Sequence, residues 1–89
     1  MYEGNDLVIF NRVVKVICEK IERSEGPLAP EKIRPENDFI KDLGADSLTV
    51  VELVIGIEDE FQIDEIPEED VERIRTVADV VEYLKRATQ

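Results

Sequence analysis

The sequence predicts an all-α fold, a four-helix bundle of three main helices plus one short helix, with a long first loop. Apolar residues recur at spacings of three and four in three separate segments, which is the pattern of helices that each bury one face. Glycine and proline separate these segments, and capping residues mark where helices start. A chain of 89 residues can build one modest core, so we expect a single domain over residues 1–89.

The first helix is expected over about residues 6–23. Its apolar residues form one stripe at helical spacing: Phe10, Val13, Val14, Ile17 and Ile21. Gly26 and Pro27 are expected to end this helix, because neither residue favours a helix interior.

The segment between the first two helices, residues 24–38, contains three prolines. Proline fixes the backbone and disfavours a long helix, so this segment is predicted to be a partly ordered loop. Leu28 and Ile33 are its expected anchors in the core. Gly44 gives the turn before the second helix its conformational freedom.

The second helix is predicted to begin at Asp46, whose side chain can accept from free backbone N–H groups of the first turn. Its buried stripe is expected to be Val50, Leu53, Val54, Ile57 and Phe61. Acidic residues occupy its other faces. Gly56, in the middle of this helix, costs about 1 kcal/mol relative to alanine, so it indicates close packing or a deliberate gap at that level.

A short third helix and a fourth helix complete the prediction. Pro67 suits the first position of the short helix, where the acidic residues that follow lie near the positive end of the helix dipole. Thr76 and Asp79 are predicted to form a capping box at the start of the fourth helix. The apolar stripe of the fourth helix is Val77, Val80, Val81 and Leu84.

The composition is strongly acidic, with 22 Asp and Glu residues against 11 Lys and Arg residues and a formal net charge of −11. Nucleic acid is not expected as a partner, because nucleic-acid binding depends on cationic side chains that neutralise phosphates. Anionic membrane surfaces are disfavoured for the same reason. Basic protein surfaces are the expected partners. Solubility alone is the alternative explanation of the acidity.

The residues for most kinds of catalysis are missing. The chain has no histidine, which is the usual base for activating a thiol or a hydroxyl, and its one cysteine, Cys18, is expected in the core. Zinc-like cysteine clusters, phosphate-binding glycine loops and EF-hand loops are also absent from the sequence. We therefore expect neither an enzyme nor a metal site. A single cysteine and the lack of a signal peptide or membrane span favour a cytoplasmic protein.

One segment carries a specific signature. Residues 42–48 read DLGADSL and are followed by VELV at 51–54; EDEF at 58–61, EIPEE at 65–69 and RTV at 75–77 come later in that order. With these motifs, the chain from about Phe39 to Leu84 resembles the acyl carrier proteins of the fatty-acid and polyketide type, at their phosphopantetheine attachment site. A serine after an aspartate at a helix start is by itself commonly only a cap, so the flanking motifs carry the resemblance.

The resemblance implies that Ser47 bears a covalent 4'-phosphopantetheine arm, with Asp46 and Leu48 beside it in the attachment motif. A phosphopantetheinyl transferase would supply the arm from coenzyme A, so Ser47 would be an acceptor and not a catalyst. The phosphodiester would lie at the positive end of the second helix, which favours a negative charge. The protein would then carry acyl groups as thioesters, and tethering would give them a high effective concentration.

The resemblance also implies two sets of contact residues. Candidates to line a pocket for the acyl chain are Val51, Val54, Ile55, Ile66 and Ile74. Candidates to contact partner enzymes are Asp46, Glu52, Ile55, Glu58 and Asp59. The expected partners are acyl-chain synthases, reductases, dehydratases and acyltransferases with basic patches, and the carrier is expected to be a monomer. Ordinary core packing and a solvated acidic face are the alternative interpretations.

Three features depart from the family pattern. Thr49 and Val50 stand where the fatty-acid type commonly has Asp and Thr, the first loop is longer and richer in proline, and residues 62–64 make the second loop about one residue longer. Fatty-acid biosynthesis is the default pathway. A specialised carrier for polyketide or other lipid synthesis and an unmodified acidic helical adaptor are the alternatives.

Overall fold

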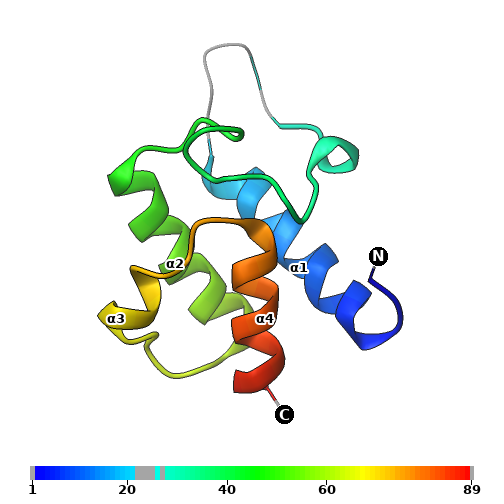
Figure 1. Ribbon diagram of the computed structural model, residues 1–89, viewed down its shortest axis with the longest axis vertical. Helices are drawn as coiled ribbons and strands as arrows, with labels where there is room; N and C mark the ends of the chain where they lie inside the picture. The colour runs from blue at the N-terminus through cyan, green and yellow to red at the C-terminus, as the bar shows by residue number, and fades with distance from the viewer. Residues whose placement is uncertain (1, 22–25, 27, 89) are drawn as a thin grey trace.

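The computed structural model describes residues 2–21, 26 and 28–88 of the chain. This part of the chain forms α1 (Asn5–Lys20), the 3-10 helix η1 (Pro30–Lys32), α2 (Ser47–Phe61), α3 (Glu68–Val71) and α4 (Val77–Ala87), as Figure 1 shows. Within the same residues there is no strand, and the one β-type contact is an isolated antiparallel bridge between Asp38 and Thr76. The prediction of an all-α fold with three main helices and one short helix is confirmed.

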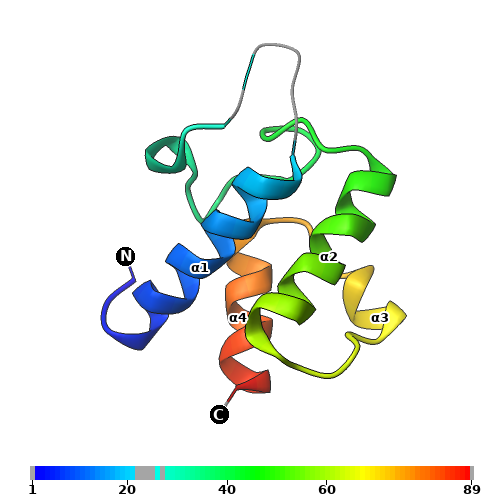
Figure 2. The same cartoon turned by 180° about the vertical axis from the view of Figure 1, so that it is seen from behind.

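Helix α1 packs against both α2 and α4, and Figure 2 shows it crossing in front of α4 with α2 beside it. The predicted end of this helix is wrong: α1 stops at Lys20 and not near residue 23. The backbone becomes extended at Ile21 (φ −93°, ψ 114°), because the chain leaves the helix there while the Ile21 side chain stays buried in the core. Residues 22–25 and Pro27 lie outside the described residues.

Residues 28–46, which lead into α2, pass over one end of the helices (Figure 1). Leu28 and Ile33 are both buried, so the predicted anchors of this loop are confirmed. The short helix η1 was not expected from the sequence. It begins at Pro30, a residue whose fixed φ suits the first position of a helical turn.

Helix α2 buries Leu53, Val54, Ile57 and Phe61, while Val50 is half-buried. Gly56 faces α1 at short range. A Cβ atom added to Gly56 would lie 2.9 Å from Cγ1 of Val16 and 2.9 Å from Cε of Lys20. The prediction of close packing at Gly56 is therefore confirmed.

Helices α3 and α4 follow the predicted signals closely. Pro67 lies one position before its predicted place, as the residue preceding α3, which begins at Glu68. The capping box of α4 is confirmed: the Asp79 N–H donates to Thr76 Oγ1 at 3.2 Å, and the Thr76 N–H donates to Asp79 Oδ2 at 3.1 Å.

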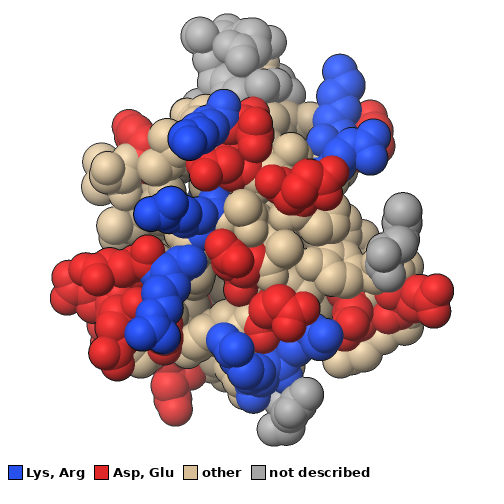
Figure 3. Space-filling view, in the orientation of Figure 1, with Lys and Arg blue, Asp and Glu red and all other residues tan. Residues whose placement is uncertain are grey.

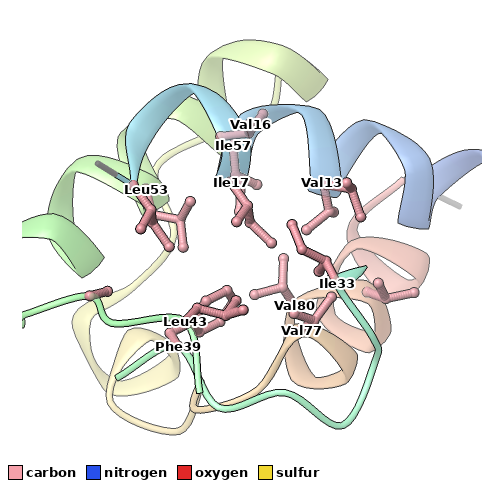
Figure 4. Close-up of a cluster of buried hydrophobic side chains, with 14 of the residues drawn as sticks. Val13, Val16, Ile17, Ile33, Phe39, Leu43, Leu53, Ile57, Val77 and Val80 are labelled. Atoms are coloured by element: carbon pink, nitrogen blue, oxygen red, sulfur yellow. The ribbon is translucent and has the colours of Figure 1, made fainter. Parts of the chain in front are cut away.

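The core is filled by side chains from the three long helices and from the loop before α2, which point toward one another in Figure 4. Phe39 and Leu43 of the loop meet Ile17 of α1 and Val77 and Val80 of α4 there. The loop that leads into α2 is thus part of the core, which fixes where α2 begins.

Cys18 lies at the edge of the core and not within it, which corrects the sequence interpretation. The side chain is half-buried, and its Sγ donates to the Leu28 carbonyl oxygen at 3.5 Å. Partial burial raises the pKa of the Cys18 thiol, and Glu31 and Glu19 add to this rise. None of the helices in the described part of the chain is long and apolar enough to cross a membrane.

Candidate functional site

A short, hydrogen-bonded turn delivers the chain to the start of α2. The Leu43 N–H donates to the Asp38 carbonyl oxygen at 3.1 Å, and the Ala45 N–H donates to the Phe39 carbonyl oxygen at 2.9 Å. Between them Gly44 has φ 79°, in the left-handed region that glycine adopts without strain. Ala45 is buried, so the turn is held against the core immediately before Asp46.

Asp46 caps α2, as predicted. Its Oδ1 accepts from the Thr49 N–H at 2.8 Å. This hydrogen bond to the Thr49 backbone, followed by one to the Thr49 side chain, holds the pKa of the Asp46 carboxyl below its usual range. Asp46 is therefore ionised near neutral pH and fixes the first turn of the helix.

Ser47 is the first residue of α2, and its side chain is exposed. In this position the hydroxyl lies at the positive end of the helix dipole, where a negatively charged substituent is favoured. None of the described residues makes a hydrogen bond to the Ser47 hydroxyl, and the sequence contains no histidine. The Ser47 hydroxyl is thus accessible from outside the fold.

A groove of about 540 Å³ opens beside Ser47. Its walls come from the loop before α2, from α2, and from the segment that joins α3 to α4. The residues that line it are Asp38, Phe39, Ile40, Lys41, Ser47, Val50, Val51, Val71, Glu72, Ile74 and Arg75. A long, mostly apolar substituent attached to Ser47 has room to lie in this groove.

A second groove, of about 560 Å³, continues along α2. Val51 and Val71 line both grooves, so the two adjoin between α2 and α3. The structure places the five predicted pocket residues in this pair of grooves. Ile74 lines the groove that holds Ser47, Val54, Ile55 and Ile66 line the second one, and Val51 lines both.

The predicted pocket residues differ in burial. Val54 and Ile66 are buried, whereas Val51 is 50% exposed and Ile55 58% exposed. Leu48 is exposed too, at 67%. Leu48, Val51 and Ile55 lie at helical spacing and form an apolar stripe on the outer face of α2, which we call the outer stripe. This stripe was not predicted as a feature, although its spacing of three and four is visible in the sequence.

The predicted partner contacts lie along the same helix but are not equivalent. Glu52 and Asp59 are exposed. Glu58 is half-buried, and its Oε2 accepts from the Ile66 N–H at 2.7 Å, so this carboxylate also closes the loop after α2. Glu60 lies on the side of α2 that faces α1.

Glu60 joins α2 to α1. Its carboxylate pairs with Arg12 at 3.1 Å and with Lys15 at 3.2 Å, and the Arg12 guanidinium also lies over the Phe61 ring. The hydrogen bonds from Arg12 and Lys15 hold the pKa of the Glu60 carboxyl below its usual range. Glu60 is therefore engaged within the fold, unlike Glu52 and Asp59.

Charged side chains of both signs cover the face shown in Figure 3, with a dense acidic group over the region of α3. In residues 2–21, 26 and 28–88, no three Cys, Asp or Glu side chains come together in a way that could hold a metal ion.

Comparison with known proteins gives consistent matches over most of the chain. A family model described as a phosphopantetheine attachment site matches residues 11–84. The acyl carrier protein of Wolinella succinogenes is 44% identical over 79 residues, which cover 89% of this chain and 96% of that protein. The acyl carrier protein of Bdellovibrio bacteriovorus is 44% identical over 80 residues (90% and 95%), and that of Clostridium perfringens is 42% identical over 81 residues (91% and 99%).

Proposed function

Because the chain belongs to the acyl carrier protein family, whose members are carriers with covalent 4'-phosphopantetheine and not enzymes, we propose that Ser47 bears the arm in this protein. The observation that carries the proposal is the exposed hydroxyl at the first residue of α2, beside a groove with an apolar floor. The arm then holds acyl intermediates as thioesters and presents them to partner enzymes.

The chemistry at Ser47 needs a second protein. The serine oxygen bonds to the phosphorus atom that carries the pantetheine in coenzyme A, and the serine proton goes to a base. The pyrophosphate bond of coenzyme A breaks at the same phosphorus atom, and adenosine 3',5'-bisphosphate leaves. No described side chain is hydrogen-bonded to the Ser47 hydroxyl, so we assign this base to the phosphopantetheinyl transferase. This chain contributes an accessible hydroxyl on a rigid turn and a helix end that favours the charge of the product.

Mass spectrometry tests the attachment directly. Incubation with coenzyme A and a phosphopantetheinyl transferase is expected to add one phosphopantetheine per chain, and Ser47→Ala is expected to add none. Thr49→Ala is the matched control, since it removes the other hydroxyl of the same helical turn and should leave loading intact. An unchanged mass with several competent transferases, or loading of the folded Ser47→Ala variant, would reject Ser47 as the attachment residue.

We propose that the acyl chain withdraws into the adjoining grooves between α2 and α3, lined by Val51, Val54, Ile55, Ile66 and Ile74. The position of Ser47 at the rim of the first groove supports this path. An apolar groove can exclude water and accept a hydrocarbon chain. The half-buried and exposed residues among the five can be covered by the chain without unfolding the core.

We propose that partner enzymes dock on the outer face of α2. Asp46, Glu52 and Asp59 supply exposed negative charge, Glu58 adds a partly shielded one, and Ile55 supplies apolar contact. Such charges mainly speed and orient encounter with a basic patch, and salt screens them. The synthases, reductases, dehydratases and acyltransferases of acyl-chain assembly are the partners that fit this role.

We propose fatty-acid biosynthesis as the pathway, with the carrier acting as a cytoplasmic monomer. The matched relatives, 95–99% of whose length is aligned, are acyl carrier proteins and support the carrier role on which this choice rests. Identification of the acyl thioester on protein purified from its own cells would test the pathway, and a polyketide or other specialised acyl group would overturn it.

A further inference from the structure

Two positively charged residues line the groove beside Ser47, in a protein whose net charge is −11. Lys41 belongs to the loop before α2, and Arg75 lies just before α4. Both residues are exposed. None of the ion pairs formed within the described residues involves Lys41 or Arg75, whereas Arg12, Lys15 and Lys85 are all paired with carboxylates.

The fold brings these two residues to one groove although they are far apart in the sequence. The Phe39 N–H donates to the Arg75 carbonyl oxygen at 3.0 Å, and the isolated bridge joins Asp38 to Thr76. The neighbouring carboxylate of Asp38 is already used within its own loop, because its Oδ1 accepts from the N–H groups of Ile40 and Lys41 at 2.8 and 2.9 Å. Those two hydrogen bonds, with smaller contributions from Lys41 and Arg75, hold the pKa of Asp38 below its usual range.

The opposite side of the α2 start has a different character. A hollow of about 430 Å³ there is lined by Glu19, Lys20, Thr49 and Glu52. It has two carboxylates and a single cation, and no apolar floor. The Ser47 groove, by contrast, has two cations, Lys41 and Arg75, beside the carboxylates of Asp38 and Glu72, and neither cation forms an ion pair within the described residues. A negative charge attached to Ser47 therefore meets more positive charge on the groove side of the helix end than on the other side.

We propose that Lys41 and Arg75 bind the phosphodiester that joins the arm to Ser47 and so direct the arm into the groove between α2 and α3. Phosphate oxygens are strong acceptors for ammonium and guanidinium groups, and the phosphorus atom is bonded to the Ser47 oxygen itself. The inference rests on the proposed attachment at Ser47. It assigns to the pair a positioning role, since neither residue takes part in thioester chemistry.

The test compares the protein before and after loading with phosphopantetheine. The variant Lys41→Gln/Arg75→Gln removes both charges, and Lys32→Gln/Arg34→Gln is the matched control, with the same change in net charge on the η1 side of the molecule. Each protein is loaded to completion with excess transferase, and loading is verified by mass. Urea unfolding of the apo and loaded forms then gives the effect of loading on the unfolding equilibrium for each variant.

Loading changes the equilibrium constant between folded and unfolded protein. This change is expected to favour folding about two- to fivefold more in the wild type than in the Lys41→Gln/Arg75→Gln variant at low salt. The difference should shrink in high salt, because both cations are exposed. The Lys32→Gln/Arg34→Gln control should behave as the wild type. Independently of stability, the ³¹P resonance of the loaded test variant should be shifted from that of the wild type and of the control.

Two results overturn the inference in distinguishable ways. If all three proteins load but share one loading effect and one ³¹P shift, the cation pair does not bind the phosphodiester, and the carrier role stands. If the wild type cannot be loaded at all, the attachment at Ser47 and the role of the pair both fail.

Discussion

Replacement of Gly56 by alanine is expected to destabilise the protein although alanine is the better helix former. At an exposed helical position the change would gain about 1 kcal/mol. Here the new Cβ would lie 2.9 Å from carbon atoms of both Val16 and Lys20. Carbon atoms in good contact are about 3.5–4.0 Å apart, so the neighbours would have to move by roughly 0.6 Å or more.

The two neighbours of Gly56 differ in their ability to move. The Lys20 stem is exposed and can swing away. Val16 is 2% exposed and β-branched, so its side chain has essentially one rotamer on a helix and no free space to enter. Overpacking of this kind costs about 1–3 kcal/mol. After the gain in helix propensity is subtracted, we expect Gly56→Ala to lower the free energy of unfolding by about 1 kcal/mol.

A double-mutant cycle separates the clash from helix propensity. In a Val16→Ala background the contacted Cγ1 is gone, so Gly56→Ala is expected to become stabilising, by up to about 1 kcal/mol. Urea unfolding followed by far-ultraviolet circular dichroism measures all four proteins. An effect of Gly56→Ala with the same sign and size in both backgrounds would refute close packing of α1 on α2 as the reason for this glycine.

Three further predictions concern the site. Hydrogen bonding lowers the pKa of Asp46 in the folded state, so the contribution of its carboxylate to stability is present above about pH 4 and is lost as the pH falls. Asp46→Asn keeps a capping group, so in the apo variant the free energy of unfolding, measured with urea, should fall less steeply below about pH 4. An octanoyl chain on the arm is expected to raise the free energy of unfolding, and Ile74→Ala should reduce this gain by about 1 kcal/mol. Leu7→Ala, on α1, should leave the gain unchanged. Equal losses in the two variants would place the acyl chain outside the Ser47 groove. Glu52→Lys should slow association with the transferase by about two- to tenfold at low salt and weaken the salt dependence of the rate. Glu36→Lys makes the same charge change elsewhere and should have neither effect. Identical association rates for the two variants would exclude docking on α2.

The sequence was sufficient to predict features whose cause is local. The capping box at Thr76 and the cap at Asp46 depend on side chains that bond within three residues of themselves, so the residue types determine them. The turn at Gly44 needs a left-handed backbone conformation, which glycine adopts without strain. Gly56 was also informative, because a glycine inside a helix needs a reason and close approach of a neighbouring helix is the common one.

The end of α1 and the helix η1 depend on tertiary contacts, and local signals missed them. Ile21 continues the apolar stripe and so extended the predicted helix. In the structure, its side chain reaches the core from an extended backbone. A buried position is compatible with both conformations, and periodicity alone could not choose between them.

The site was predictable in its parts and not in its arrangement. The candidates Ser47 and Asp46 could be selected from their motif, but the placement of Lys41 and Arg75 at one groove arises from backbone contacts between residues 38–39 and 75–76. Likewise, Glu58 accepts a hydrogen bond from the Ile66 N–H, whereas Glu52 is exposed, although both are acidic residues of one helix. Pairings across a long sequence separation leave no periodic signal for a single sequence to reveal.

The outer stripe of α2 has no evident role in stability. Leu48, Val51 and Ile55 are between 50% and 67% exposed, and the packing of α1 against α2 already buries the opposite face through Leu53 and Ile57. Polar residues at the three outer positions would serve an isolated protein equally well and would lower its tendency to self-associate. Because the fold does not need these apolar side chains, their presence favours intermittent contact with a cargo chain or a partner surface. The groove and the docking face proposed above both include Val51 or Ile55, so a chain lying in the grooves would cover apolar area that a docked partner would otherwise meet.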